Sequence, residues 1–306
     1  MRFEPTSDQR DFAASLDALL AGADPVGAAR AWADGDHAAG VRLWQRLAEQ
    51  GLTQLATEAS PVEVVIALEA LGRHAVPGPW VESAAYIPLA LGREVDGIAT
   101  VAVPPHVPYA LDADVADDVY VGSTPASAVG ARLTSVDPAR RLFEVTGTGE
   151  ADPAAFDLAV LATAAQLLGA GERVLADSVT YVKQRKQFGR EIGSYQAIKH
   201  KLADVRIALD FARPLAYGAA LVSTGSTGEA TGSAGERARA VSAAKVACGD
   251  AAYLAARTGL QVHGAIGYTR EFDLSLWLTK IRALVTAWGT PGFHRDRILT
   301  SLREAR

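Results

Sequence analysis

The stretch 181-YVKQRKQFGREIGSYQ-196 carries four Lys or Arg residues and no acid in its first ten positions. It closes a long helical pattern, and Gly189 is the kind of residue at which a helix ends. Cations in the last turns of a helix interact favourably with the helix dipole, so this stretch can be read as an ordinary helix end. The formal net charge of the chain is −5, however, and so basic a segment raises the question of what else it contacts.

The pattern on either side of this stretch predicts a bundle of long helices. Asp152-Pro153 supplies a cap and a proline at the first helical position, and the helix is expected to run from there to Phe188. Ser194 is expected to cap the next helix, in which Pro214 introduces a kink. A flexible connection at residues 223–235 and further helices over Glu236–His263, Glu271–Val285 and Phe293–Arg303 complete the prediction.

The N-terminal part is also helical, and a β-rich segment separates it from the bundle. Three N-terminal helices are predicted: Asp8–Leu20 capped by Ser7, His37–Gln50, and one that opens at Ser60-Pro61 and ends at Gly72. Between Gly97 and Gly149 the segments IATVAV, DVYVG, ARLTSV and RLFEVTG are short and β-branched. They predict a small antiparallel sheet of four strands.

Composition excludes several classes of function. Cys248 is the only cysteine, which excludes an internal disulfide and a multi-cysteine metal site, and the six histidines lack ligand spacing. There is no GxSxG, P-loop or dinucleotide-binding glycine motif. The acidic balance argues against nucleic acid, and no signal core or eighteen-residue apolar run is present, so we expect a cytoplasmic protein without a membrane span. The acidic residues Asp112, Asp114, Asp117 and Asp118 are interpreted as a solvated loop.

Several motifs in order resemble the acyl-CoA dehydrogenase family. RKQFG (185–189) is followed by SYQAIKHKLAD (194–204), QVHGAIGYTREFDLSLWLTKIRAL (261–284) and AWGTPGFHRDRI (287–298). The segments FEPTSDQRDFAASL (3–16), WQRLAEQGL (44–52) and ALEALGRHAVPGPWVESA (67–84) also fall in the family's order. The resemblance covers residues 1–92 and 152–306. It implies a mainly α fold: an N-terminal helical domain (1–95), a reduced middle β-domain (96–151) and a C-terminal four-helix bundle (152–306) that pairs across subunits.

The resemblance also implies a role for the basic stretch. In the family, the arginine of the RKQFG-type motif reaches FAD held by a neighbouring subunit, so Arg185 is expected to pair with the pyrophosphate, where a guanidinium suits phosphate oxygens. Phe188 is expected near the adenosine half, and Gln196 as a further contact. The resemblance places Gln261 and the turn Val262-His263-Gly264-Ala265 against the same cofactor through backbone atoms. Ala265 replaces the family's usual second glycine.

The catalytic base of the family is missing. Most members carry it as the glutamate of a YEGT-like motif, and the corresponding residues here are 287-AWGT-290, so that Trp288 stands in place of the carboxylate. An indole accepts no proton at neutral pH. A second position used in some branches corresponds to Ala159, and the nearby acids Asp157 and Glu172 are interpreted as surface or cap carboxylates. The TEPxxGSD-like stretch, the tryptophan-bearing strand and the VPxxYGG-type loop of relatives are absent as well.

These losses share one place, the flavin-ring and acyl pocket, whereas the motifs that serve a neighbour's FAD persist. The resemblance therefore implies a subunit without its own catalytic residue, which joins a full-length acyl-CoA dehydrogenase subunit in a heterotetramer. Such two-plus-two enzymes of actinobacteria act on steroid-derived CoA thioesters and pass electrons to an acceptor. The alternatives are a non-enzymatic scaffold or CoA-ester-binding homo-oligomer, and a homomeric flavin oxygenase of the same fold.

Overall fold

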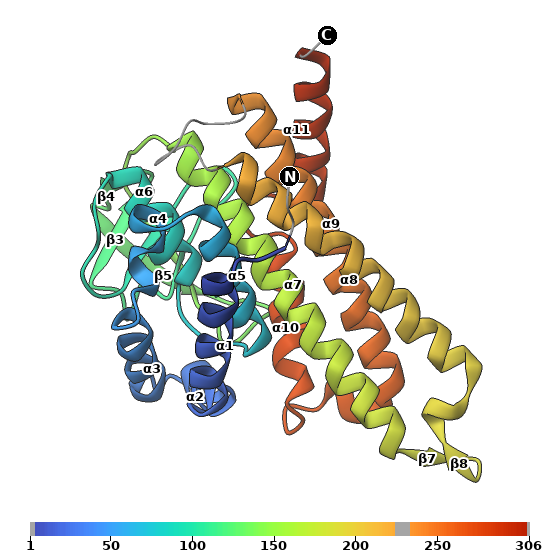
Figure 1. Cartoon of the computed structure of the whole chain (residues 1–306). Coiled ribbons are helices and arrows are strands. Elements are labelled where there is room, and N and C mark those ends of the chain that lie inside the picture. The colour runs from blue at the N-terminus through green and yellow to red at the C-terminus, as the bar shows by residue number, and fades with distance from the viewer. Residues whose placement is uncertain (1–3, 224–232, 305–306) are drawn as a thin grey trace.

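The computed structural model describes residues 4–223 and 233–304, which are mainly helical with a small β-region, as the sequence predicted (Figure 1). The N-terminal helices are α1 (Ser7–Ala21), α2 (Pro25–Ala33), α3 (Ala38–Ala48), η1 (Leu52–Gln54), α4 (Leu55–Glu58), α5 (Pro61–Arg73), the π-helical turn η2 (Glu82–Tyr86) and α6 (Ile87–Leu91). The strands are β1 (Ala99–Ala102), β2 (Ala110–Leu111), β3 (Asp118–Val121), β4 (Thr124–Pro125), β5 (Ala128–Leu133) and β6 (Leu142–Thr146). The C-terminal elements are α7 (Pro153–Gln184), β7 (Lys186–Gln187), β8 (Arg190–Glu191), η3 (Ile192–Ser194), α8 (Gln196–Val222), α9 (Ala234–His263), η4 (Gly264–Tyr268), α10 (Leu274–Leu284) and α11 (Pro291–Glu304).

Local capping explains where the N-terminal helices begin. Thr6, rather than the predicted Ser7, caps α1 in a reciprocal capping box with Gln9. Ser60 and Glu63 form the same box at α5, as the Ser60-Pro61 signal predicted. Gly72 does not end α5, because the helix continues to Arg73. α2 was not predicted at all, although it has the usual start signal, with Asp24 at the N-cap and Pro25 as the first helical residue.

The helices α5 and α7 cross at two glycines. A Cβ placed on Gly72 would lie 2.1 Å from the backbone oxygen of Gln166, and one on Gly169 would lie 1.9 Å from that of Glu69. No side chain fits in either place. The two glycines therefore set how closely the N-terminal helices approach the bundle.

The β-region contains two small sheets instead of the single antiparallel sheet that was predicted. One sheet has the order β1-β3-β4 and the other β2-β6-β5 within the described residues. β1 pairs with β3 in parallel, with Ala99 opposite Asp118. Parallel pairing joins strands that are distant in the sequence, so local patterns do not reveal it.

Three acids of the segment beside β2, Asp114, Asp117 and Asp118, are exposed as predicted, but the fourth is not. Asp112 is fully buried, and its Oδ1 accepts hydrogen bonds from the Trp32 indole at 3.1 Å and from the Arg141 amide at 3.2 Å. The Arg141 guanidinium also pairs with Asp112 at 3.3 Å and with Asp114 at 2.8 Å. This cluster ties the helix pair α2–α3 to the β-region.

The bundle is built around α7. This helix is long and apolar enough to cross a membrane by length and composition, but 94% of that apolar stretch is buried inside the protein. In Figure 1, α8, α9 and α10 run alongside it. Most of the predicted flexible connection, at residues 224–232, lies outside the described residues, and Ser233 caps α9 directly after it.

The two acids of α7 are buried, and their interpretation as surface or cap carboxylates was wrong. Asp157 is 1% exposed and accepts from Arg237 at 2.9 Å and from Arg297 at 2.5 Å. Glu172 is 9% exposed and pairs with two arginines of α8, which hold the pKa of its carboxyl below the usual value against the effect of burial. Both acids hold helices together.

A single hydrophobic cluster includes residues from the N-terminal helices, from β1 and β3, and from the bundle. A small second cluster lies between the strands of the other sheet. The domain boundaries at 95/96 and 151/152 therefore stay predictions, because the core is continuous across them.

Candidate functional site

The basic stretch folds as a short hairpin beyond the end of a helix. α7 ends at Gln184 instead of Phe188, because Arg185 adopts an extended conformation with ψ near 121°. β7 and β8 then pair, and Phe188 and Gly189 form the turn between them with φ of 52° and 82°. Positive φ at both central residues is typical of tight two-residue hairpins. Gly189 therefore makes the turn of the hairpin and does not end the helix.

The hairpin presents unpaired groups to its surroundings. Arg185 is exposed, and its guanidinium has no hydrogen-bond or ion-pair partner among residues 4–223 and 233–304. The Phe188 ring is 91% exposed. The neighbouring cations are engaged: Lys186 lies 3.4 Å from Glu191, and Arg190 lies 4.0 Å over the Tyr195 ring.

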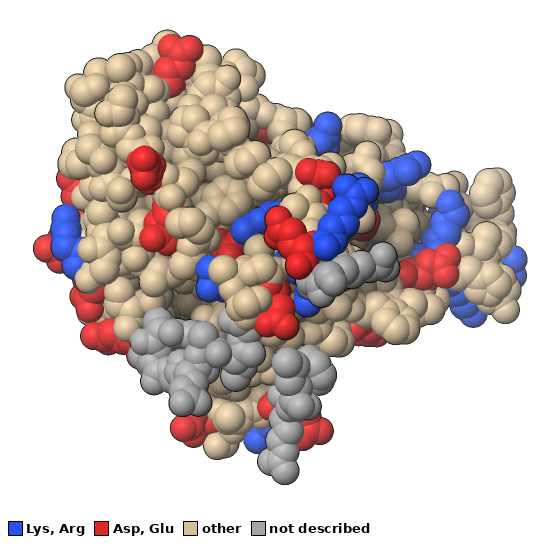
Figure 2. All heavy atoms as spheres, turned by 90° about the horizontal axis from the view of Figure 1, so that it is seen from above, with Lys and Arg blue, Asp and Glu red and all other residues tan. Residues whose placement is uncertain are grey.

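Figure 1 shows the hairpin projecting from one end of the bundle. Figure 2 shows that acidic groups predominate over the broad end of the molecule, whereas the narrow end carries several Lys and Arg groups beside an acidic one. The net negative charge of the chain is thus unevenly distributed. The hairpin end offers a local attraction for an anionic group.

The helix that follows begins at Gln196, whose side chain is exposed. Ser194 does not cap this helix as predicted. Its hydroxyl donates to the Glu191 carbonyl at 2.7 Å, and the N-cap position belongs to Tyr195 without a side-chain hydrogen bond. The N-terminus of α8 therefore keeps free amide groups near the hairpin.

The C-terminal end of α9 lies beside the same region. Gln261 is exposed and accepts a hydrogen bond from Lys201 of α8 at 2.6 Å. Val262 and His263 are buried, with 6% and 5% exposure, whereas Gly264 and Ala265 are exposed. Gly264 has φ 65° and ψ −141°, a conformation that essentially only glycine adopts.

His263 connects this turn to the end of α7. Its ring stacks on Tyr181 with a centroid separation of 4.2 Å, and the Tyr181 carbonyl accepts from the Arg185 amide at 2.9 Å. Burial lowers the pKa of His263, so the neutral ring predominates at neutral pH, and its Nδ1 lies 2.8 Å from the Gly259 carbonyl. The stacked pair is thus a structural link between the hairpin and the Val262–Ala265 turn.

These contacts bring the predicted cofactor residues to one end of the bundle. The Lys201–Gln261 bond joins the first part of α8 to the end of α9, and the Tyr181–His263 pair joins α9 to α7. A groove of about 630 Å³ opens there, lined by Lys201, Asp204, Leu254, Arg257, Thr258, Leu260, Gln261, Gly264 and Tyr268. Sequence reasoning missed Arg257, an exposed cation without a side-chain partner in the described part of the chain.

Trp288, the residue in place of the expected base, is buried. It is 1% exposed and has φ 55°, and its ring packs against Tyr86 and Phe156. The indole Nε1 donates to Glu82 Oε1 at 3.3 Å, and the Trp288 carbonyl lies 3.0 Å from His294 Nε2. Ala159 is also fully buried in the core. Neither position provides a carboxylate.

Glu82 is a buried acid that sequence reasoning missed. It lies on the π-helical turn η2 and is 2% exposed, and its Oε2 has no hydrogen-bond partner in the described structure. Burial raises the pKa of this carboxyl. Its signal in the sequence is one acid inside the apolar run 80-WVESAAYIPL-89.

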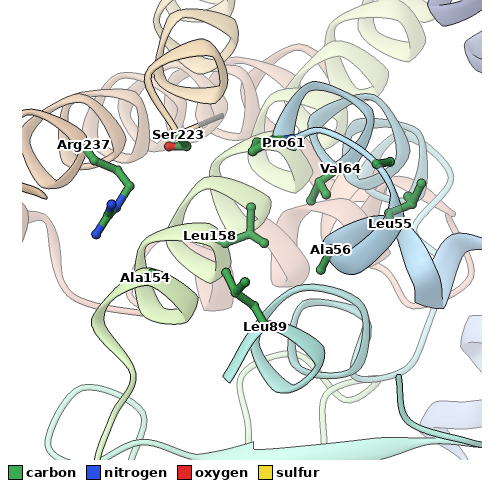
Figure 3. A pocket seen from close by; sticks show the side chains of 10 residues that line it. Leu55, Ala56, Pro61, Val64, Leu89, Ala154, Leu158, Ser223 and Arg237 are labelled. Carbon is green, nitrogen blue, oxygen red and sulfur yellow. The ribbon is translucent and has the colours of Figure 1, made fainter. Parts of the chain in front are cut away.

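A different cavity, of about 180 Å³, lies between α4, α5, α6 and the start of α7 (Figure 3). Its lining is mostly apolar and includes Leu55, Val64, Leu89 and Leu158. The one cation in its wall, Arg237, is paired with Asp157 at 2.9 Å. This cavity contains none of the predicted site residues.

Comparisons with known proteins identify the family. The profile of the acyl-CoA dehydrogenase C-terminal domain matches residues 151–302. Acyl-CoA dehydrogenase IpdE2 of Mycobacterium tuberculosis is 32% identical over 298 residues, which cover 89% of each chain. This chain belongs to the acyl-CoA dehydrogenase family.

Solved structures of acyl-CoA dehydrogenases share the fold. A chain of the ChsE4-ChsE5 complex from Mycobacterium tuberculosis superimposes with a TM-score of 0.79 and 21% identity over 99% of each chain. The Tcur3481-Tcur3483 steroid ACAD, as a G363A variant, gives a TM-score of 0.80 and 19% identity over 97% of this chain and 98% of the other. These similarities show that the chain has the fold of the acyl-CoA dehydrogenase family.

Acyl-CoA dehydrogenases are FAD flavoproteins, and the donor set at the hairpin end suits part of that cofactor. An unpaired guanidinium at Arg185 and the exposed cation Arg257 suit phosphate oxygens. The exposed rings of Phe188 and Tyr268 offer faces for an adenine, and the Gly264 turn leaves its backbone accessible. Trp288, in contrast, has a buried side chain and offers no comparable group to a cofactor.

Proposed function

We propose that this chain is a subunit of a heteromeric FAD-dependent acyl-CoA dehydrogenase and that a full-length partner supplies the catalytic glutamate. The observation that carries the proposal is Trp288, a fully buried indole at the position of the family's base. α,β-Dehydrogenation requires a carboxylate within reach of the α-proton of the acyl group. Trp288 and Ala159 leave this chain without one at either position that the family uses.

The proposed contribution of this chain is to hold a cofactor bound mainly by the partner. In this proposal Arg185 donates hydrogen bonds to the pyrophosphate of FAD, and Phe188 packs near the adenosine half. The side chains of Gln196 and Gln261 form further hydrogen bonds with the cofactor. Val262, His263, Gly264 and Ala265 form the turn that presents its backbone, and the stacked His263 fixes that turn from inside. FAD held there would supply the acceptor for the β-hydrogen, which leaves as a hydride, whereas the α-proton would go to the glutamate of the partner.

An apolar face on the bundle supports a partner of the same fold. Ile207, Phe211 and Leu215 are exposed at 52%, 75% and 45%, and they lie at intervals of four residues on α8. We call these three residues the α8 stripe. Side chains spaced in this way share one face of a helix, and an exposed apolar stripe marks an interaction surface. A bundle helix of a second acyl-CoA dehydrogenase subunit is the proposed occupant.

The names of relatives suggest the substrate class. The Tcur3481-Tcur3483 structure is of a steroid acyl-CoA dehydrogenase, and both it and ChsE4-ChsE5 contain two different subunits by name. We therefore propose a steroid-derived CoA thioester as substrate, a two-plus-two heterotetramer as the assembly, an electron-transfer protein as acceptor and the cytoplasm as location. The non-enzymatic scaffold and the homomeric oxygenase remain outcomes of the test below.

The test is to measure flavin content with and without a partner. We expect the chain purified alone to contain little FAD and to turn over no acyl-CoA. Co-expression with a full-length acyl-CoA dehydrogenase of the same organism is expected to give about one FAD per pair of subunits and activity with a dye acceptor. Arg185→Ala is expected to weaken FAD retention in that complex by about tenfold or more, because a charge-assisted hydrogen bond is lost.

Lys183→Ala is the matched control, since Lys183 is an exposed cation two residues before Arg185. Equal losses in both variants would mean that only long-range attraction acts at this helix end. Stoichiometric flavin and turnover in the isolated chain would contradict the proposal that a partner subunit is required. A complex that contains no flavin and has no activity would favour the alternative of a non-enzymatic scaffold protein.

A further inference from the structure

The cavity of about 180 Å³ between α4, α5, α6 and the start of α7 shares no lining residue with the groove beside the hairpin. All of its lining residues are apolar except Ser223 and Arg237. In another protein, an engineered apolar cavity of about 150 Å³ stays dry and binds benzene. The apolar part of this cavity therefore has room for a ring or a hydrocarbon chain of about that size.

The two polar residues lie on the same side of the cavity. Figure 3 shows Arg237 of α9 and Ser223 at the end of α8 on this side, with Leu55 and Val64 on the opposite side. The Ser223 hydroxyl donates to the Ala219 carbonyl at 2.8 Å, so its proton is not available to a ligand. Arg237 is thus the one lining side chain that can donate a hydrogen bond into the cavity.

Arg237 keeps donors free for such a ligand. Its Nε donates to Asp157 Oδ2 at 2.9 Å, whereas its two terminal nitrogens have no hydrogen bond or ion pair within residues 4–223 and 233–304. The side chain is 24% exposed, and neither terminal nitrogen is among the unpaired polar atoms that are buried. These nitrogens therefore keep accessible surface. Two N–H groups on one edge of a guanidinium match the two oxygens of a carboxylate.

The local charge also favours an anion. Asp157 is 1% exposed and is shared by two arginines, Arg237 at 2.9 Å and Arg297 at 2.5 Å. It is the only ion-pair partner of either arginine in the part of the chain that the structure describes, so one positive charge has no counterpart. No acid other than Asp157 pairs there, and none lines the cavity.

We propose that this cavity binds a short-chain monocarboxylate. Its hydrocarbon part lies against Val64, Leu89 and Leu158, and its carboxylate accepts hydrogen bonds from the terminal nitrogens of Arg237. An alcohol of the same length fills the apolar part but supplies no charge for the guanidinium, and a shorter acid leaves part of the apolar space empty. The site lies within this chain and involves no flavin, so its test is independent of the proposed dehydrogenase.

The test uses the full chain and three ligands: hexanoate, 1-hexanol and butanoate, compared by titration calorimetry. We expect hexanoate to bind at least about tenfold more tightly than 1-hexanol, because it forms charge-assisted hydrogen bonds. It is expected to bind about fifteenfold more tightly than butanoate, since each of two further methylenes contributes about fourfold when buried. Shifts of the Val64 and Leu158 methyl resonances in NMR spectra report binding at this cavity.

Two variants separate the charge from the apolar space. Arg237→Gln is expected to weaken hexanoate binding by about tenfold or more and to leave 1-hexanol binding unchanged, because only the charge is lost. Ala154→Leu is expected to weaken the binding of both ligands, because the larger side chain occupies part of the cavity. Arg239→Gln is the control, since it removes a cation of the same helix that does not line the cavity.

Three results would overturn the proposal. One is equal binding of hexanoate and 1-hexanol by the unaltered chain, and another is binding of hexanoate without shifts of the Val64 and Leu158 methyl resonances. Neither of these depends on a variant that folds. The third is an unchanged affinity for hexanoate in Arg237→Gln or Ala154→Leu, with the variant folded by circular dichroism.

Discussion

Asp112 is the residue at which pH is expected to act on stability. Burial raises the pKa of its carboxyl to about 7, although Arg141 and the Trp32 indole pull the pKa the other way. Between its ordinary value of 3.8 and about 7, the folded chain holds a proton that the unfolded chain has released. The stabilising effect of protonated Asp112 is therefore present below pH 4 and is lost as pH rises through this window.

Asp112→Asn keeps the acceptor for the Trp32 indole and cannot titrate. We expect the wild type to lose stability relative to this variant between pH 5 and pH 7, by at most about 1.4 kcal/mol per pH unit. Urea unfolding at several pH values measures this difference. Parallel curves for the two proteins would contradict it, and Asp296→Asn, at an exposed acid, serves as the control for charge.

Single residues were predictable from sequence where their role is local. Ser60 and Pro61 predict the start of α5 correctly, because the capping hydrogen bonds join residues no more than three positions apart. Asp112, Asp157 and Glu172 were interpreted wrongly, because their arginine partners are at least 29 residues away in the sequence. The assignment of Trp288 to the position of the family's base stays a prediction from resemblance, whereas the contact of Glu82 with the indole could not be predicted from sequence.

At the level of elements, the crossing of α5 and α7 is expected to be intolerant of any side chain. Gly72→Ala would place a methyl group 2.1 Å from the Gln166 carbonyl oxygen, so the two helices must move apart. We expect a loss of about 1–3 kcal/mol in the free energy of unfolding, measured in urea. Gly249→Ala is the matched control, because its methyl group would meet only Leu167 Cδ1 at 4.0 Å.

Gly249→Ala is expected to be neutral or to stabilise α9 by up to about 1 kcal/mol, because alanine has the higher helix propensity. Similar losses at both glycines would show that the α5–α7 contact is not the cause. Both positions lie inside helices, so the helix propensity of alanine alone predicts the same sign for the two variants.

Elements were predicted well where strong end signals surround a long periodic pattern. Asp152 and Pro153 fix the start of α7 within one residue. Its other end was wrong by four residues, because the hairpin at Phe188–Gly189 competes with the helix and neither has a distinctive local signal. The pairing of the strands could not be predicted from local sequence patterns, because pairs such as β1–β3 join segments that are distant in the sequence.

For the whole molecule, assembly is expected to depend on the α8 stripe. Phe211→Asp places a charge at its centre, where the side chain is 75% exposed. We expect this variant to stay folded as a single chain but to lose association with the partner subunit or with itself, measured by size-exclusion chromatography with light scattering. Burying an unpaired carboxylate in an interface costs several kcal/mol.

Val129→Asp is the control for this experiment, because it adds the same charge at an exposed apolar residue of β5. Loss of association in both variants, or in neither, would contradict a specific role of the stripe. Sequence patterns predicted a bundle, but they could not tell which of its apolar faces remain uncovered, because that depends on how all the helices pack.

The contact between Trp288 and Glu82 has a consequence for which residues position 288 can accept. Replacing the indole by glutamate, the residue that the resemblance predicts at this position, would bring two carboxyls together where little of either side chain is exposed. Only one of them could ionise there, and a void would remain where the aromatic rings had been. We therefore expect Trp288→Glu to lower the stability of the fold unless position 82 is changed as well.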